Sequence, residues 1–478
     1  MTLARLVLPA LRASASGDFE HERGRIDEAL ALGVGGFIIF GGAPDVVARL
    51  TAELTRRAGR PLLIGSDLER GAGQQFAGLS EFPPPLALAS LDDLAAVATA
   101  AAVTAREARS VGVNWVFAPD ADLDVLPANP IVQTRSFGAD PALVSACVRT
   151  WVEACQAAGA LACAKHYPGH GRTATDSHAG LPVVSESADI LEADLAPFRA
   201  AVAANVASIM TAHVAFPALD PSGVPATRSS RILGALRADP DFRGLVVTDA
   251  LIMDAATTGR SEVEGVVDAV AAGVDILLYP NDTANVVRAL NDAAASGRIG
   301  AQRVEDALSR YGRALARAGE ALPELPTSAP GEFSAAIADR LVEAGAASLP
   351  LGNFTAPLEL ITVDDDLGGP YPPGPSDCLS QALDAAGVPL GPGGSRMALV
   401  FAEPRAWKGR AGLGDASRAA LGQAGALDLI VLFGHPRLTA ELPRGVPVLV
   451  AWHRQRLMQH AVARWLSRPP APGAAPRG

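Results

Sequence analysis

Residues 161–178 read LACAKHYPGHGRTATDSH, in which a short apolar run passes directly into a polar, glycine-rich segment. The apolar residues 161–164 are typical of a buried strand, and Lys165 and His166 follow where that strand is expected to end. In folds that alternate strands with helices, catalytic residues lie in the loops at the carboxyl ends of the strands. The stretch therefore indicates a β/α fold with functional groups at the mouth of its sheet.

The polar part of this stretch concentrates residue types that are scarce elsewhere in the chain. It holds three of the eight histidines, His166, His170 and His178. It also holds Lys165, one of only two lysines among 40 lysine and arginine residues. A lysine in a chain that otherwise uses arginine suggests a site that needs a compact ammonium group.

Three interpretations of this segment compete. His166 and His170 have the spacing of two metal ligands on one helical turn, and Asp176 and His178 would complete the site. A proline and a glycine lie between the two histidines, however, so the segment is not a regular helix and that spacing loses its meaning. A purely structural loop is the second alternative. We favour acid/base chemistry over both, and we expect neither a metal nor a cofactor.

Length and composition restrict the class of protein. The 478 residues suggest two or three domains, and 49% hydrophobic with 19% charged residues provide for a large core. The net charge of −11 argues against a nucleic-acid partner, because no excess of positive charge is present to neutralise phosphates. The four cysteines, at positions 147, 155, 163 and 378, form no CxxC pair, as is usual in a reducing compartment.

Export and membrane insertion are not expected. The N-terminal stretch 1–12 is apolar, but two arginines and a proline interrupt it, which favours a first strand over a secretory signal. No run of about 18 apolar residues is present, so no transmembrane helix is predicted. We therefore expect a cytoplasmic protein without a membrane partner, and the oligomeric state is left open.

Eight short β-rich runs recur along the first 320 residues, separated by alanine-, leucine- and arginine-rich stretches such as 45–57 and 141–158. The predicted strands are Arg5–Leu11, Gly36–Phe40, Pro61–Ser66, Val113–Ala118, Leu161–Lys165, Ser208–His213, Gly244–Thr248 and Val274–Tyr279. Such alternation implies a parallel sheet, and eight units of this length fit a closed TIM-type (β/α)8 barrel. A doubly wound open sheet is the alternative, but residues 11–17 lack its glycine-rich fingerprint.

Polar residues cluster at the predicted carboxyl ends of neighbouring strands. They are Asp67, Glu69, Asp120, Asp122, Lys165, His166, His213 and Asp249. For any one of them, a helix cap or a salt bridge is the more common role. For the whole set, the shared rim of the barrel favours catalysis.

After residue 320 the composition changes. Residues 321–333 form a proline-rich linker, and residues 334–467 are predicted to form a small α/β domain that opens with a helix at 334–347. The tail, residues 468–478, is predicted to be disordered. His435 and His453 follow predicted strands in this domain and are assigned a surface or packing role.

Two features of the barrel point to a reaction. Asp176 precedes His178 by two residues, so its carboxylate would orient the imidazole and raise its basicity. Asp249 ends a buried strand and is expected to face the mouth of the barrel. A lone carboxylate opposite a proton donor is the arrangement used for retaining cleavage of glycosides.

The motifs at 165–171, 176–178 and 247–253 resemble the signature of glycoside hydrolase family 3, in its β-N-acetylhexosaminidase branch. Further matches at 114–122, 135–141, 209–214 and 273–275 follow in the family's order and span about residues 5 to 315. The resemblance implies that His178, paired with Asp176, is the acid/base and that Asp249 is the nucleophile. It also implies that the sugar-binding residues are Asp67, Arg135, Lys165 and His166.

This resemblance predicts a retaining exo-glycosidase that removes terminal β-linked N-acetylglucosamine from muropeptide-like cell-wall fragments or chitooligosaccharides. Alternatives are a β-glucosidase of the same family, a β-glycoside phosphorylase and a non-catalytic sugar-binding protein. A neutral histidine acid/base tolerates an incoming phosphate better than a carboxylate does. The chain departs from the family in the loop after the third strand, where Ala72 and Gln75 replace two arginines. The identity of the terminal sugar therefore stays open.

Overall fold

The computed structural model describes residues 2–174, 180–320, 330–347, 349, 354–368, 373–403, 405 and 408–468. By their contacts the residues divide into two compact units. The first, the barrel unit, comprises Met1–Ser80, Asp92–Leu126 and Ser136–Thr327. The second, the C-terminal unit, comprises Glu81–Leu91, Pro127–Arg135 and Ser328–Gly478. Two segments from the first third of the chain thus cluster with its last third.

The strands of the barrel unit are parallel and neighbour one another in chain order. Seven of them form one sheet from β2 to β8, and β1 pairs with β9. Their bounds are β1 Val7–Leu8, β2 Ala10–Arg12, β3 Gly36–Phe40, β4 Leu63–Ser66, β5 Trp115–Val116, β6 Leu161–Tyr167, β7 Ser208–Thr211, β8 Leu245–Thr248 and β9 Leu277–Leu278.

Hydrogen bonds outside these named strands close the sheet into a barrel. Next to β9, the carbonyl of Ile276 accepts from Thr248 N at 3.0 Å, and Ile276 N donates to the carbonyl of Val246 at 3.2 Å. On the other side, β1 and β2 are two parts of one predicted strand, separated by Pro9, which has no N–H to donate. The carbonyl of Pro9 still accepts from Ile38 N at 3.0 Å. The predicted (β/α)8 barrel is confirmed.

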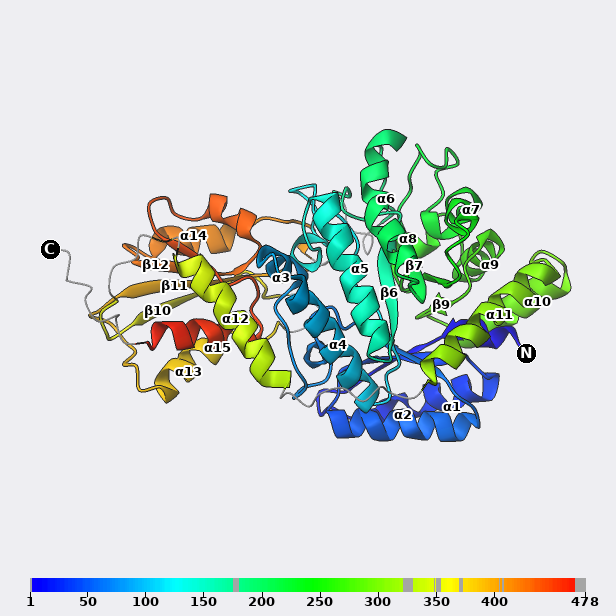
Figure 1. Ribbon diagram of the computed structural model, residues 1–478, viewed down its shortest axis with the longest axis horizontal. Helices are drawn as coiled ribbons and strands as arrows, with labels where there is room; N and C mark the ends of the chain where they lie inside the picture. The colour runs from blue at the N-terminus through cyan, green and yellow to red at the C-terminus, as the bar shows by residue number, and fades with distance from the viewer. Residues whose placement is uncertain are drawn as a thin grey trace. The chain divides into compact units, whose positions relative to one another are not determined.

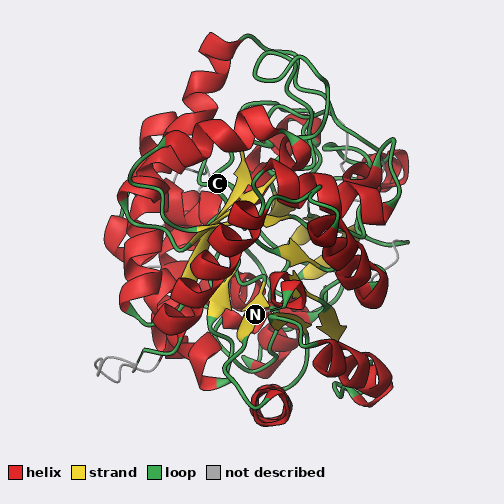
Figure 2. Cartoon of the chain, turned by 90° about the vertical axis from the view of Figure 1, so that its right-hand side faces the viewer, coloured by secondary structure: helices red, strands yellow, loops and turns green. Residues whose placement is uncertain are grey.

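Helices alternate with these strands and lie outside them (Figure 2). Figure 1 shows α4, α5 and α6 side by side, and of these α5 and α6 contact β6. Side-chain caps begin several of them, for example Asp93, which accepts from two N–H groups of α4, and Ser261, which forms a capping box with Glu264. The helices are α1 Arg23–Leu32, α2 Pro44–Ala58, α3 Pro85–Ser90, α4 Leu94–Ser110, α5 Pro141–Ala157, α6 Ala188–Ala203, α7 Ser230–Ala238, α8 Asp254–Thr257, α9 Glu262–Ala272, α10 Thr283–Ala295 and α11 Ala301–Ala318, of which α3 belongs to the C-terminal unit.

One buried carboxylate joins the amino end of β8 and the segment before β9 to two helices. Asp275 is fully buried and pairs with Arg237 of α7 and with Arg303 and Arg310 of α11. Its Oδ2 also accepts from the backbone N of Val246 at 3.0 Å, at the start of the β8 segment. This cluster lies at the opposite ends of the strands from the polar rim, which makes it a structural group.

The C-terminal unit contains a four-stranded parallel sheet in the order β10, β11, β12 and β13. Its elements are α12 Pro330–Ala347, β10 Glu359–Asp364, α13 Cys378–Ala385, β11 Arg396–Ala402, α14 Asp415–Gln423, β12 Leu429–Gly434, β13 Val448–Val450 and α15 Arg456–Leu466. The predicted small α/β domain is confirmed. Helix α12 begins four residues before the predicted Ser334, because a proline in the first turn needs no hydrogen-bond partner for its nitrogen.

Buried ion pairs follow the strands of this second sheet. Lys408, the other lysine, pairs with Asp366 at 2.5 Å, and Arg454 pairs with the same carboxyl group at 2.7 Å. His453 Nε2 lies 2.8 Å from Glu403 Oε1, and both His435 and His453 are buried. The predicted linker up to residue 329 and the tail from residue 469 lie outside the described residues. Among the helices that the structure describes, none has the length and apolar character to cross a membrane.

Candidate active site

The carboxyl ends of the barrel strands carry the polar rim expected from the sequence. Strand β6 extends to Tyr167, two residues beyond its predicted end at Lys165, so His166 belongs to the strand as well as Lys165. The carbonyl of Tyr167 accepts from Ala212 N at 2.8 Å, which continues the pairing with β7. The two basic residues therefore lie within a buried strand, at an irregularity where the register of its pairing with β7 shifts between Ala164 and Tyr167.

Lys165 lies between two carboxylates that follow β4. Its Nζ is 2.8 Å from Asp67 Oδ1 and 2.7 Å from Glu69 Oε1. The side chains of Lys165 and Glu69 are 3% and 4% exposed, whereas that of Asp67 is 34% exposed. Asp67 is thus the carboxylate that a ligand can reach, and Glu69 is the buried counter-ion that holds the ammonium in place.

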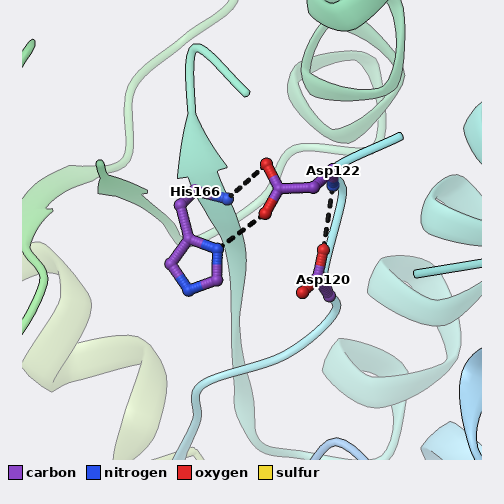
Figure 3. Close-up of side chains that lie close together, drawn as sticks. All are labelled: Asp120, Asp122 and His166. Atoms are coloured by element: carbon purple, nitrogen blue, oxygen red, sulfur yellow. Dashed lines mark hydrogen bonds and ion pairs between the residues drawn. The ribbon is translucent and has the colours of Figure 1, made fainter. Parts of the chain in front are cut away.

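His166 is held by Asp122, a fully buried carboxylate from the segment after β5. Figure 3 shows the imidazole with Nδ1 turned toward this carboxylate, at 2.7 Å from Oδ2. Oδ1 accepts from the backbone N of His166 at 3.2 Å and from that of His170 at 2.6 Å. Asp120 Oδ1 in turn accepts from Asp122 N at 3.0 Å. The carboxylate therefore fixes both the ring and the backbone of β6.

Asp249 follows β8 and lies beside the same histidine. Its Oδ2 is 3.9 Å from His166 Nε2, and its Oδ1 accepts from Ala250 N at 2.7 Å. Burial alone would raise the pKa of Asp249, but the nearby His166 and His213, the Ala250 N–H and Lys165 outweigh it and lower the pKa to about 2. The side chain is 21% exposed. Asp249 is therefore an ionised and accessible carboxylate at neutral pH.

The three buried histidines near this carboxylate differ in the direction of their pKa shifts. Burial lowers the pKa of His166, but Asp122, Asp249 and Asp120 outweigh it, so the pKa is raised. Burial lowers the pKa of His170 to about 4, and it also lowers the pKa of His213. His166 is thus the histidine of the three whose environment favours the protonated form.

Asp120, Asp122 and His166 are close enough for their ligand atoms to surround one cation, since these atoms lie within 4.8 Å of one another. The oxygens of Asp122 already accept three N–H groups, one of them from the His166 ring. A carboxylate that orients an imidazole in this way is the arrangement of a supporting residue. We therefore assign these contacts to the orientation of His166.

The predicted site residues fall into three groups. The structure brings Asp67, Lys165, His166 and Asp249 together at the rim. Arg135 ends a short 3-10 helix in the segment that clusters with the C-terminal unit, and its N–H donates to the carbonyl of Val132 at 2.8 Å. The proposed acid/base pair, Asp176 and His178, lies outside the described residues.

The two departures from the family's loop have defined positions. Ala72 is fully buried, and Gln75 Oε1 accepts from Gly41 N at 3.2 Å. Gln75 thus links the loop after β4 to the loop after β3. Its amide oxygen is engaged with the backbone, in place of the positive charge that an arginine would carry there.

Residues 25–314 match the family described as Glycosyl hydrolase family 3 N terminal domain. The chain belongs to glycosyl hydrolase family 3. The match begins in α1 and ends in α11, so it covers the barrel from its first helix to its last. The family predicted from the motifs is confirmed.

Several relatives of this family 3 chain bear names of hexosaminidases. It is 34% identical over 279 residues to a β-N-acetylglucosaminidase/β-glucosidase of Cellulomonas fimi, covering 56% of the chain and 49% of that protein. It is 36% identical over 296 residues to a β-hexosaminidase of Thiobacillus denitrificans, covering 59% of the chain and 79% of that protein. The chain thus spans about half the length of the Cellulomonas fimi relative.

A solved structure resembles the whole chain. It is that of a glycoside hydrolase family 3 β-N-acetylglucosaminidase from Paenibacillus sp. str. FPU-7, with a TM-score of 0.82 and 28% identity. The similarity covers 97% of this chain and 95% of that one. The C-terminal sheet is therefore part of the shared architecture as well as the barrel.

Sequence reasoning missed the roles of Glu69 and Asp122. Both were recognised as rim residues, but their partners are 96 and 44 positions away along the chain, at Lys165 and His166. The available signal was the pairing of one rare lysine and one adjacent histidine with several carboxylates on one rim. That signal predicts ion pairs, but it does not indicate which carboxylate pairs with Lys165 and which with His166.

Proposed function

We propose that this protein is a retaining exo-β-N-acetylglucosaminidase that removes terminal β-linked N-acetylglucosamine from muropeptide-like cell-wall fragments or chitooligosaccharides. The observation that carries the proposal is Asp249, an ionised and partly exposed carboxylate at the carboxyl end of β8, next to His166 and Lys165. Family membership and the names of the hexosaminidase relatives support the same reaction.

In the proposed reaction Asp249 attacks the anomeric carbon and forms a glycosyl ester. The glycosidic C–O bond breaks, and His178, oriented by Asp176, gives its proton to the leaving oxygen. The same histidine then takes a proton from water, whose oxygen attacks the anomeric carbon and releases Asp249. The roles of Asp176 and His178 rest on the sequence motif alone.

The sugar is held in this proposal by Asp67, Arg135, Lys165 and His166. Asp67 has the exposure needed to accept hydrogen bonds from hydroxyl groups, and Lys165 gives it a fixed position. A protonated His166 offers its Nε2–H to the same region, close to Asp249. Hydrogen bonds to charged groups of this kind are worth about 1.5–3 kcal/mol each, enough to select one sugar orientation.

A β-glucosidase activity is the second candidate, and one observation favours it. Gln75 and Ala72 leave this loop without the two arginines of the family, which changes the groups available to a substituent on the sugar. The name of the Cellulomonas fimi relative includes both activities. A glucoside must therefore be tested beside the N-acetylglucosaminide.

The test compares 4-nitrophenyl β-N-acetylglucosaminide with 4-nitrophenyl β-glucoside, each with and without inorganic phosphate. Faster turnover of the former, with free sugar as product in both buffers, is expected. A sugar 1-phosphate formed in the phosphate buffer would instead establish a phosphorylase. Asp249→Asn should lower kcat by several orders of magnitude, and a 2-deoxy-2-fluoro glycoside should label Asp249. Labelling of another residue would refute the assignment of the nucleophile.

A further inference from the structure

Asp122 and His166 form a carboxylate–imidazole pair at the rim of the barrel, and neither residue belongs to the Asp176 and His178 motif proposed as the acid/base. We propose that Asp122 is a positioning residue: it fixes the tautomer of His166, so that Nε2 faces Asp249, and it anchors the start of the segment that follows β6. The inference rests on the proposed glycosidase function, because it assigns the means by which one substrate-binding residue of that site is oriented.

The contacts of Asp122 are distributed over both of its oxygens. Oδ2 accepts from the ring of His166 at 2.7 Å, and Oδ1 accepts from the backbone N of His166 and of His170. One fully buried carboxylate thus holds two points of the chain that are four residues apart, on either side of the turn after β6. Loss of this group would release the ring and the backbone together.

The backbone of Asp122 is itself held by two hydrogen bonds. Its N–H donates to Asp120 Oδ1 at 3.0 Å, and its carbonyl accepts from Ser136 Oγ at 2.6 Å. Leu123, the residue after Asp122, packs against Gly171 in the segment after β6. A Cβ added to Gly171 would lie 1.7 Å from the carbonyl oxygen of Leu123. The space at this position requires glycine. Two independent contacts therefore hold the segments after β5 and β6 against each other.

A carboxylate determines the tautomer of its partner because it accepts hydrogen bonds without donating any. Nδ1 of His166 must therefore carry a proton whether the ring is neutral or charged. Nε2 is the nitrogen that gains or loses the second proton, and it lies 3.9 Å from Asp249 Oδ2. The nitrogen that faces the nucleophile and the sugar is thus the one that titrates.

The groups around His166 come from several elements. Asp120 and Asp122 follow β5, Asp249 follows β8, and His170 lies in the segment after β6. Lys165 precedes His166 and is paired with Asp67 and Glu69. Burial opposes a charge on His166, and the three carboxylates outweigh it and raise the pKa. His170 carries no charge at neutral pH, because burial lowers its pKa to about 4. The ring is thus arranged to present Nε2–H as a donor.

Asp122→Asn tests this role with almost no change of shape. The amide oxygen is needed by the two backbone N–H groups, so the amide nitrogen must face Nδ1 of His166 and donate to it. Nδ1 then becomes an acceptor, and the neutral ring carries its proton on Nε2. In protein labelled with 15N-histidine, the His166 signals should change to the opposite tautomer, and the pKa of the ring should fall.

The kinetic result expected for Asp122→Asn is a loss of about 10- to 100-fold in kcat/KM, the usual effect of removing the group that orients a functional histidine. The loss should be equal for aryl glycosides and for substrates with poor leaving groups, since the acid/base itself is unchanged. Combined with His166→Ala, the substitution should add little further loss. An additional loss of full size in that background would overturn the proposal.

The matched control is Asp275→Asn, which removes another fully buried carboxylate of the barrel, at the amino ends of β8 and β9. It should lower the melting temperature without changing the His166 signals or their titration. If Asp122→Asn does not fold, the 15N-histidine spectra of the wild-type protein still test the proposal. In its neutral form, the wild-type His166 must carry its proton on Nδ1. A wild-type ring protonated on Nε2 alone would overturn the inference.

These outcomes are separable from those of the proposed function. Failure of the fluorinated glycoside to label Asp249 would refute the proposed reaction, whereas the histidine spectra report on Asp122 without any substrate. A protein that hydrolyses the N-acetylglucosaminide but shows unchanged His166 signals in Asp122→Asn would retain the proposed function and lose this inference.

Discussion

The buried lysine at the rim gives the sharpest prediction for stability and activity together. Lys165→Met removes an ammonium group whose Nζ lies 2.7 Å from Glu69 and 2.8 Å from Asp67. Removal of one partner from a buried ion pair costs about 3–5 kcal/mol, because the remaining charge stays in the interior. The 4% exposure of Glu69 places that pair in this class, while Asp67, at 34%, regains much of its hydration. We expect the Glu69 pair to account for most of the loss.

The assay is urea unfolding at pH 7, followed by tryptophan fluorescence and repeated for the double variant Lys165→Met/Glu69→Gln. The single variant should unfold with an equilibrium constant larger by about two to three and a half orders of magnitude, since 1.4 kcal/mol corresponds to a factor of ten. The double variant should recover at least half of the stability, because no buried charge is left without its partner lysine. Its activity should stay low, since Asp67 has lost the group that positions it. An unchanged unfolding midpoint in Lys165→Met, or a double variant no more stable than the single one, would refute this reasoning.

Three further predictions follow from the site. The pKa of Asp249 is about 2 in the folded protein, so its stabilising effect is present above the unfolded value of 3.8 and is lost as the pH falls toward 2. Asp249 should therefore not produce an acid limb in the pH profile of kcat/KM above pH 4. If the wild type has such a limb and it disappears in an Asp249 variant that keeps some activity, this prediction is wrong. The pKa of His170 is lowered to about 4, so the unfolded chain binds the extra proton between pH 6.5 and 4 and stability falls over that range. His170→Asn should flatten the dependence of the melting temperature on pH in that window, and an unchanged slope would argue against a neutral buried ring. His178→Ala should slow substrates with poor leaving groups far more than 4-nitrophenyl glycosides, and Asp176→Ala should shift the alkaline limb to lower pH. Equal losses for all leaving groups would point to another acid/base.

The main features of the barrel could be predicted because they depend on local pattern. Alternating apolar runs and helical stretches identified all eight strand positions, since each strand and each helix is encoded by its own periodicity. Two differences from the predicted bounds lie at the ends of elements. Strand β6 continues to Tyr167, because pairing with β7 outweighs the polar character of Lys165 and His166. Helix α12 begins at Pro330, because proline suits a first helical turn and does not mark the end of a linker there.

The sequence did not indicate which segments of the chain make up the C-terminal unit. Residues 81–91 and 127–135 lie between barrel strands in the chain but cluster with the C-terminal unit. Two contacts show how this happens: Gln455 Nε2 donates to the carbonyl of Phe82 at 2.7 Å, and Leu457 N donates to Glu81 at 3.2 Å. The partners are more than 370 positions apart, so no local pattern indicates them.

By itself the sequence determined which residues reach the rim of the barrel. In a parallel barrel all carboxyl ends lie on one side, so placing Asp67, Lys165, His166 and Asp249 at strand ends is enough to bring them to one face. The tertiary structure alone decided how these groups act on one another. Glu69 is the buried partner of Lys165, and Asp122 holds the His166 ring, because distances between segments far apart in the chain set which charges meet. Burial and those distances also decide charge, which is why three buried histidines on one rim have pKa values shifted in different directions.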